Sequence, residues 1–173
     1  MNPEILRANE KYVDNYTRPD WSEFTNLVII TCCDPRVDPY GQLGLKNGQA
    51  IIIRNAGGSA VDALRSIVVP QYLLPDNNCE IAVMHHTDCG LSKVTTDQIR
   101  ELVKSGNPGR DDIAAMVDNM EFHHIQDIEE SVKNDVRYLA EHPLILKGTK
   151  LSGWVQDTET GKISKVVEAM ALS

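Results

Sequence analysis

Three short apolar runs, separated by segments with helical spacing, constrain the fold of this chain more than any other feature. The runs cover residues 27–30, 50–53 and 81–84, and each ends in glycine, proline or polar residues. Short apolar runs that end in turn signals are typical of fully buried strands. Because buried strands that alternate with helices pair in parallel, the chain is predicted to be an α/β protein with a mostly parallel β-sheet flanked by helices.

The helices are predicted from apolar spacing and from start and stop signals. Amphipathic spacing predicts helices over residues 3–16, 92–104 and 127–140. A short helix is expected to begin at Asp38 and Pro39, with Asp38 capping its first turn, and to stop near Gly48. Another is expected to begin after Ser59 as its N-cap, and Pro70 predicts a kink or an early stop in it.

The C-terminal part has the pattern of a hairpin. Residues 151–155 and 163–167 flank residues 157–162, which carry turn signals, so a C-terminal hairpin or an antiparallel edge strand is expected. A turn is expected over residues 75–78, and a charged surface loop over residues 104–112.

Length and charge narrow the possible functions. A chain of 173 residues is expected to form a single domain over residues 1–173, with an N-terminal helical arm over residues 1–20. It carries 25 acidic and 17 basic residues, a formal charge of -8, and no basic cluster, so neither nucleic acid nor a membrane is an expected partner. Its apolar runs are far shorter than the ~20 residues that span a bilayer, and its start lacks a secretory pattern. We therefore expect a cytoplasmic protein, whose four cysteines indicate metal binding or catalysis before disulfides.

Reactive side chains directly follow two of the apolar runs. Cys32, Asp34 and Arg36 come after the first run, and His86 and Cys89 come after the third. The carboxyl ends of parallel strands meet at one edge of a sheet, where ligands bind, so the two groups can share one site. Thiolate and imidazole suit Zn²⁺, and three protein ligands leave a fourth position open, as in catalytic zinc sites. We expect Cys32, His86 and Cys89 to bind one zinc ion.

Asp34 and Arg36 are the expected catalytic pair. An extended backbone would place Cys32, Asp34 and Arg36 on one face, although Pro35 interrupts the strand. Arg36 is then expected to keep Asp34 ionised, so that Asp34 can orient the reacting water. If Asp34 instead binds the zinc, the site is closed. A purely structural zinc is the alternative, although such sites normally close with a fourth cysteine or histidine.

The glycine-rich loop at residues 54–59 is the expected wall of the substrate pocket. It has neither the Walker nor the dinucleotide-binding pattern, so a tight turn that lets backbone approach a ligand is expected in place of a phosphate site. A small linear substrate is expected to lie against Asn55, Ala56 and Gly57, with Gly90 at the same edge of the sheet.

Four other residues have plainer interpretations. Cys33 should point away from Cys32 on the strand and be buried, and Cys79 should be buried as well. His85 is equally suited to a structural role and to carrying protons near the pocket, since histidine side chains can exchange protons near neutral pH. Asp88 is expected to cap the turn that follows it.

The Cys-x-Asp-x-Arg motif at residues 32–36, followed by the His-x-x-Cys-Gly motif at residues 86–90, resembles the β-class carbonic anhydrase family in its compact, non-plant-type branch. The likeness extends to residues 53–57 and 153–157, and so over nearly the whole chain. The resemblance implies a zinc enzyme in which a metal-bound hydroxide hydrates carbon dioxide reversibly to bicarbonate. It also implies the three ligands named above, the Asp-Arg dyad, and a homodimer or homotetramer.

The neighbourhood of residues 21–24 departs from part of that family. The plant-type branch has a glutamine shortly before its first strand that helps to bind bicarbonate, whereas this chain has Trp-Ser-Glu-Phe there. The departure leaves carbonyl sulfide or carbon disulfide as alternative substrates. A weakly active zinc-binding homologue is the second alternative, although Asp34 and Arg36 favour an enzyme, since a structural zinc needs neither.

Overall fold

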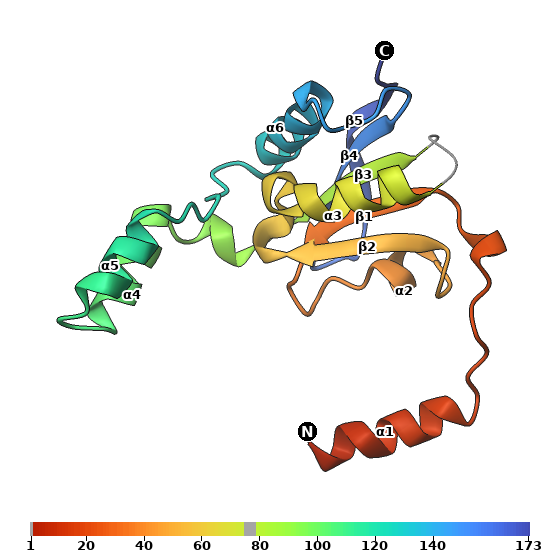
Figure 1. The fold of residues 1–173 in the computed structure, drawn as a ribbon, viewed down its shortest axis with the longest axis horizontal. Coiled ribbons are helices and arrows are strands. Elements are labelled where there is room, and N and C mark those ends of the chain that lie inside the picture. Colours follow the sequence, from red (N-terminus) through yellow and green to blue (C-terminus); the bar gives the residue numbers. More distant parts are fainter. Residues whose placement is uncertain (1, 75–78) are drawn as a thin grey trace.

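The structure is a computed structural model that describes residues 2–74 and 79–173, apart from the side chain of Trp21 (Figure 1). Within these residues, five strands form one sheet in the order β2-β1-β3-β4-β5. They are β1 (Leu27–Cys32), β2 (Ala50–Asn55), β3 (Glu80–His86), β4 (Lys150–Gln156) and β5 (Ile163–Ala171). The first four are parallel, and β5 pairs antiparallel with β4. The expected mostly parallel sheet with an antiparallel edge strand is confirmed.

The helices cover the sheet according to the direction of each crossover. They are α1 (Pro3–Val13), α2 (Pro39–Leu43), α3 (Ala60–Leu73), α4 (Thr96–Ser105), α5 (Asp111–Asp118) and α6 (Ile128–Glu141), with short 3₁₀ turns η1 (Trp21–Glu23), η2 (Ala56–Gly58) and η3 (Gly90–Ser92). The chain crosses from β1 to β2 in one direction and from β2 to β3 in the other. Because such crossovers are right-handed, α2 and α3 lie on opposite faces.

The main core lies between the sheet and helices α3 and α6. Apolar side chains of α3 and α6 pack in one buried cluster with those of β1, β3 and β4, including Ile30, Ile67, Val83, Leu139 and Leu151. A smaller cluster on the other face is centred on β1 and β3. Since β1 and β3 are covered on both faces, their continuous apolar runs are explained.

The neighbouring strands β1 and β3 form the switch point of the sheet. The chain leaves β1 for one side of the sheet and returns to the other side of β1 as β3. Ligands in open α/β sheets bind beyond the carboxyl ends of strands at such a point. The residues that follow β1 and β3 are therefore well placed to form a site.

Two of the expected helix signals act differently in the structure. Asp38 is the N-cap of α2 but its side chain makes no capping hydrogen bond. The helix ends at Leu43, because Gly44 adopts a left-handed conformation that closes it, so the expected stop near Gly48 is wrong. Helix α3 continues through Pro70 to Leu73. An early stop is therefore also wrong, since a proline in the last turn removes only one hydrogen bond near the helix end.

The helix expected over residues 92–104 is present as α4, whereas α5 was not predicted. Helix α4 begins only at Thr96, where Thr95 and Gln98 form a capping box. The expected surface loop over residues 104–112 is shorter than predicted, since α5 starts at Asp111. The turn expected over residues 75–78 lies outside the described residues.

Helix α1 confirms the helix expected near the N-terminus, although it ends at Val13 and buries none of its residues. It lies apart from the sheet at the end of an extended segment, whereas α4 and α5 project from another side (Figure 1). In the described part of the chain, no helix combines the length and apolar character needed to cross a membrane. The division into one domain with an arm over residues 1–20 stays a prediction.

Candidate metal centre

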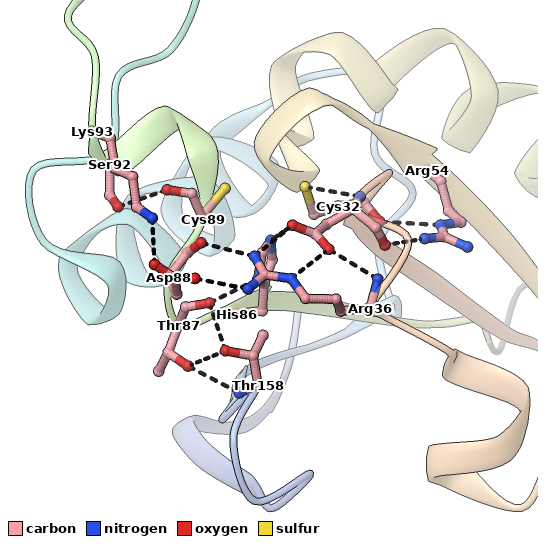
Figure 2. Close-up of polar contacts among 11 residues, drawn as sticks. Cys32, Arg36, Arg54, His86, Thr87, Asp88, Cys89, Ser92, Lys93 and Thr158 are labelled. Atoms are coloured by element: carbon pink, nitrogen blue, oxygen red, sulfur yellow. Dashed lines mark hydrogen bonds and ion pairs between the residues drawn. The ribbon is translucent and has the colours of Figure 1, made fainter.

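Cys32, His86 and Cys89 come together at the carboxyl ends of β1 and β3. Cys32 is the last residue of β1, His86 is the last residue of β3, and Cys89 lies just before η3. Their ligand atoms all lie within 4.8 Å of one another, and all three side chains are buried. The register that pairs β1 with β3 places the two strand ends side by side (Figure 2).

Hydrogen bonds orient His86 toward the two cysteines. Its Nδ1–H donates to the carbonyl oxygen of Thr87 at 2.9 Å, which leaves Nε2 as the acceptor nitrogen. Nε2 is buried and, within the described part of the chain, has no hydrogen-bond partner. The hydroxyl of Thr158 contacts the same Thr87 carbonyl at 3.2 Å. A buried acceptor that faces two thiols is the arrangement of a metal ligand with its supporting hydrogen bonds.

The three residues fit a zinc ion. Ligand bonds of about 2.0–2.3 Å in a tetrahedral site place ligand atoms roughly 3.3–3.8 Å apart, which is compatible with atoms that all lie within 4.8 Å of one another. Two sulfurs and one imidazole nitrogen are the donors that zinc prefers. Three protein ligands would leave one position for water or substrate.

The two thiols of the centre influence each other strongly. A hydrogen bond with the Cys89 thiol, more than any other contact, lowers the pKa of Cys32. The same contact with Cys32, together with burial, raises the pKa of Cys89. The backbone N–H of Asp34 also donates to the Cys32 sulfur, at 3.4 Å. The site therefore stabilises one thiolate before any metal binds, and a divalent cation would favour the second.

Asp34 and Arg36 form a bidentate ion pair beside these ligands. Arg36 Nε donates to Asp34 Oδ1 at 3.0 Å, and Arg36 Nη2 donates to Asp34 Oδ2 at 2.8 Å. Hydrogen bonds from the Arg36 side chain hold the pKa of Asp34 well below its usual range. Asp34 Oδ2 lies 4.0 Å from His86 Nε2. An ionised carboxylate thus lies beside the place where a metal would bind.

The strand was expected to be interrupted at Pro35, but it ends earlier. Strand β1 ends at Cys32, and the Val37 N–H donates to the Asp34 carbonyl at 3.0 Å, which closes a turn. The Arg36 N–H also donates to Asp34 Oδ1 at 2.9 Å. The turn, and not alternation along a strand, brings the two side chains together.

Asp88 was expected to cap the turn that follows it, and this expectation is wrong. Its side chain binds Arg36 and Lys93 instead. Arg36 Nη1 donates to Asp88 Oδ2 at 2.7 Å, and Lys93 Nζ lies 2.5 Å from Asp88 Oδ1. Lys93, and then Arg36, lower the pKa of Asp88 to about 2. Cys89 occupies the N-cap of η3 instead. No sequence pattern indicates the contact with Arg36, which lies in the loop after a different strand.

The glycine-rich loop packs directly against the ligands. Gly57 is buried and Gly58 has φ 76°. A Cβ atom on Gly58 would lie 3.0 Å from the Cys32 backbone nitrogen, and one on Gly57 would lie 2.8 Å from Leu91 Cδ1. Only glycine allows this close approach. Ser59 accepts a hydrogen bond from the Asp62 N–H and caps α3, as expected.

The four expected pocket residues lie in different settings. Ala56 and Gly57 belong to η2, which contacts η3. Asn55 instead uses its side-chain amide to bind the Ser59 carbonyl, at 2.9 Å. Gly90 follows Cys89, and a Cβ atom on it would meet no atom within 4 Å. Their contact with substrate stays a prediction.

The structure also places three residues that were given simpler roles. His85 is buried on α6's side of β3, with Nε2 3.2 Å from Asp135 Oδ2, a setting that supports a structural role. Cys79 is buried, as expected. Cys33 is exposed, so its expected burial is wrong, because β1 ends at Cys32 and strand alternation no longer applies.

Two supporting residues were not predicted from the sequence. Arg54 donates to the carbonyl oxygens of Cys32 at 3.0 Å and of Asp34 at 2.6 Å, so it holds the backbone that follows β1. Thr158 pairs with Thr87 from the β4–β5 turn. Both lie far from the motifs in sequence, and their residue types carry no chemical signal.

Comparisons with known proteins find relatives that are similar over nearly the whole chain. A family model described as carbonic anhydrase matches residues 27–163. Beta-carbonic anhydrase 1 of Mycobacterium tuberculosis is 34% identical over 168 residues, which cover 96% of this chain and 98% of that protein. The solved structure of a carbonic anhydrase from Glaciozyma antarctica is similar with a TM-score of 0.83 and 42% identity, over 93% of this chain and 95% of that one.

A relative with a different named activity is also similar. Carbon disulfide hydrolase of Acidithiobacillus thiooxidans is 30% identical over 151 residues, which cover 79% of this chain and 75% of that protein.

Proposed function

The chain belongs to the β-class carbonic anhydrase family, and from this we propose that it hydrates carbon dioxide reversibly to bicarbonate, with zinc bound by Cys32, His86 and Cys89. The observation that carries the proposal is the position of Asp34. Its carboxylate lies 4.0 Å from the free nitrogen of His86 and is kept ionised by Arg36. A structural metal site has no use for an ionised carboxylate beside an open ligand position.

Each residue has a defined part in the reaction. A zinc ion held by the three ligands would supply the Lewis acidity that makes water a nucleophile near neutral pH. Asp34 accepts a hydrogen bond from the attacking water, which orients a lone pair of that water toward the substrate carbon. Arg36 donates a hydrogen bond to each Asp34 oxygen, which fixes the orientation of the carboxylate and keeps it ionised. Atoms balance as carbon dioxide plus water gives bicarbonate plus a proton.

The surroundings of the ligands suit an apolar, linear substrate. Cys32 and Cys89 pack in a small buried cluster with Ile125, and Leu91 and Ile128 lie against it. The buried backbone of Gly57 closes another side. Carbon dioxide has no net dipole and its carbon is electrophilic, so an apolar wall beside the nucleophile binds it without competing for the attacking water.

Hydrolysis of carbonyl sulfide or carbon disulfide is the second candidate. It is supported by the similarity to carbon disulfide hydrolase and by the apolar cluster around the sulfurs, which can also accommodate a sulfur atom. The same residues would act on each of these substrates, because all have an electrophilic carbon. Apolar contacts alone typically allow a pocket to discriminate between two such substrates by roughly 10- to 200-fold in kcat/KM.

The substrate is tested by measuring kcat/KM for carbon dioxide, carbonyl sulfide and carbon disulfide on one zinc-loaded preparation. We expect carbon dioxide to be preferred by about tenfold or more over either sulfur compound. The Cys32→Ser protein provides the background rate for each substrate. Efficient hydrolysis of a sulfur compound, with carbon dioxide hydration at the background rate, would replace the first candidate by the second. Background rates for all three would favour a weakly active homologue.

We also propose a homodimer or homotetramer. Several apolar side chains of α1 are exposed, namely Ile5, Leu6, Tyr12 and Val13, and contact with a second copy of the chain would cover them. A location in the cytoplasm stays a prediction from the sequence.

A further inference from the structure

Arg36 joins the loop after β1 to the loop after β3. Besides its two hydrogen bonds to the Asp34 carboxylate, it donates from Nη1 to Asp88 Oδ2 at 2.7 Å and from Nη2 to the Asp88 carbonyl at 3.0 Å. Figure 2 shows Arg36 beside Asp88, with Lys93 on the far side of Asp88. The guanidinium therefore binds two carboxylates that lie 52 residues apart in the sequence.

The geometry of these contacts fixes the plane of the guanidinium. Arg36 donates from Nε and Nη2 to the two carboxylate oxygens of Asp34, and from Nη1 and Nη2 to one carboxylate oxygen and the backbone carbonyl of Asp88. A guanidinium is planar, so two bidentate partners determine its orientation fully. Asp34 alone cannot do so, because it lies two residues from Arg36 on the same turn and would move with it.

Lys93 holds the second oxygen of Asp88. Its Nζ lies 2.5 Å from Asp88 Oδ1, while Arg36 takes Oδ2. Asp88 also has a left-handed backbone, with φ 57°, a conformation that aspartate tolerates better than most residues. The Asp88 carboxylate is thus held between two cations, one from each side.

Stability alone does not account for this network. The side chains of Arg36, Asp88 and Lys93 are 46%, 49% and 61% exposed, and exposed ion pairs contribute little to the free energy of unfolding. The chain nevertheless places this network against Asp34, whose carboxylate is 15% exposed. Its effect is therefore expected on the orientation of Asp34.

We propose that Asp88, supported by Lys93, is a positioning residue that keeps Arg36 on Asp34 and so prevents Asp34 from turning onto the metal. This inference rests on the proposed function, because it takes the three ligands to hold a metal. Asp34 Oδ2 is already 4.0 Å from His86 Nε2, so a small rotation would bring it into the open ligand position. Arg36 and the metal thus compete for one carboxylate, and Asp88 shifts that competition toward Arg36.

The experiment measures thiocyanate binding to cobalt-loaded protein by the visible absorption of the cobalt ion. Thiocyanate needs the open ligand position, so it binds only those molecules in which Asp34 stays on Arg36. In Asp88→Asn, we expect the thiocyanate dissociation constant to rise about two- to fivefold, the size expected from one exposed ion pair. Lys93→Ala should cause a smaller rise. On zinc-loaded protein, kcat/KM should fall by the same factor in each variant.

Two controls separate positioning from general damage. Asp97→Asn removes another exposed aspartate that pairs with an arginine, at 3.0 Å from Arg100, and should leave thiocyanate binding unchanged. In an Asp34→Ala background, Asp88→Asn should have no effect on thiocyanate binding, because the group through which it acts is gone.

An unchanged thiocyanate dissociation constant in Asp88→Asn with full cobalt content would overturn the proposal. So would an equal effect of Asp88→Asn in the Asp34→Ala background, or loss of cobalt from Asp88→Asn, since Asp88 would then support the ligands directly. These readouts need no substrate. They therefore stand even if carbon dioxide hydration is not found, whereas a protein that binds no cobalt at all would contradict the metal centre and the inference together.

Discussion

Replacing Cys32 or Cys89 by serine is expected to remove zinc from the protein and reduce turnover to background. Each residue would supply one of three ligands, and both sulfurs lie within 4.8 Å of the other ligand atoms. The loss of affinity should exceed the ~10- to 100-fold that loss of an outer hydrogen-bond partner typically causes, since a hydroxyl is a poor replacement for a thiolate. Zinc content after dialysis, measured by atomic absorption, provides the test.

Cys33→Ser is the matched control for this prediction. Cys33 is the neighbour of Cys32 in the chain but is exposed, so its replacement should leave zinc content and turnover unchanged. Full zinc retention in both Cys32→Ser and Cys89→Ser would show that the metal binds elsewhere. An equal loss of zinc in Cys33→Ser would show that the effect is not specific to the buried thiols.

Asp34→Asn is expected to keep its zinc and lose most of its activity. None of the three proposed ligands changes, but the amide carries no charge and cannot accept hydrogen bonds at both of its positions. General acid–base groups typically contribute about 100- to 10,000-fold to the rate, so kcat should fall by that order. The measurement is stopped-flow hydration kinetics on protein of known zinc content.

Asp38→Asn is the control for Asp34→Asn. Asp38 lies on the same segment, is exposed, and makes no capping hydrogen bond, so kcat should remain at the wild-type value. Wild-type turnover in Asp34→Asn would exclude Asp34 from the reaction. Loss of zinc in this variant would instead place Asp34 among the ligands, which is the closed form of the site considered from the sequence.

The centre of the fold and the ligand cluster could be predicted because both depend on patterns that are local in the sequence. The apolar runs of β1 and β3 are buried on both faces of the sheet, and a buried strand is apolar throughout. Since neighbouring parallel strands end at one edge, the residues that follow them meet. The proximity of Cys32, His86 and Cys89 therefore follows from the order of the strands in the sheet.

The supporting contacts could not be predicted because they join segments that are distant in the sequence. Asp88 binds Arg36 from 52 residues away, and Thr158 contacts Thr87 from 71 residues away. Neither pair has a periodicity or a motif. Only the packing of the loops at the sheet edge determines which charges and hydroxyls meet there.

The errors near the site have a common physical cause. Cys33 was expected to be buried, and Asp34 and Arg36 to share a face despite the interruption expected at Pro35, because alternation was extended beyond Cys32, where β1 ends. After the Cys33 N–H, which still donates to the Asn55 carbonyl, the hydrogen bonds that Asp34 accepts from the Arg36 and Val37 N–H groups organise the backbone as a turn. The alternation of side chains along a strand predicts their directions only as far as the residue at which the strand ends.

Zinc titration of metal-free protein tests the proposed function most directly. Protein stripped by a chelator is mixed with increasing zinc, and carbon dioxide hydration is followed by stopped flow at each addition. The rate should rise from background in proportion to added zinc and level off at about one zinc per chain, as a single three-ligand site requires. A rate that stays at the uncatalysed level through several zinc ions per chain would contradict zinc-dependent hydration, as would full activity in protein without measurable metal.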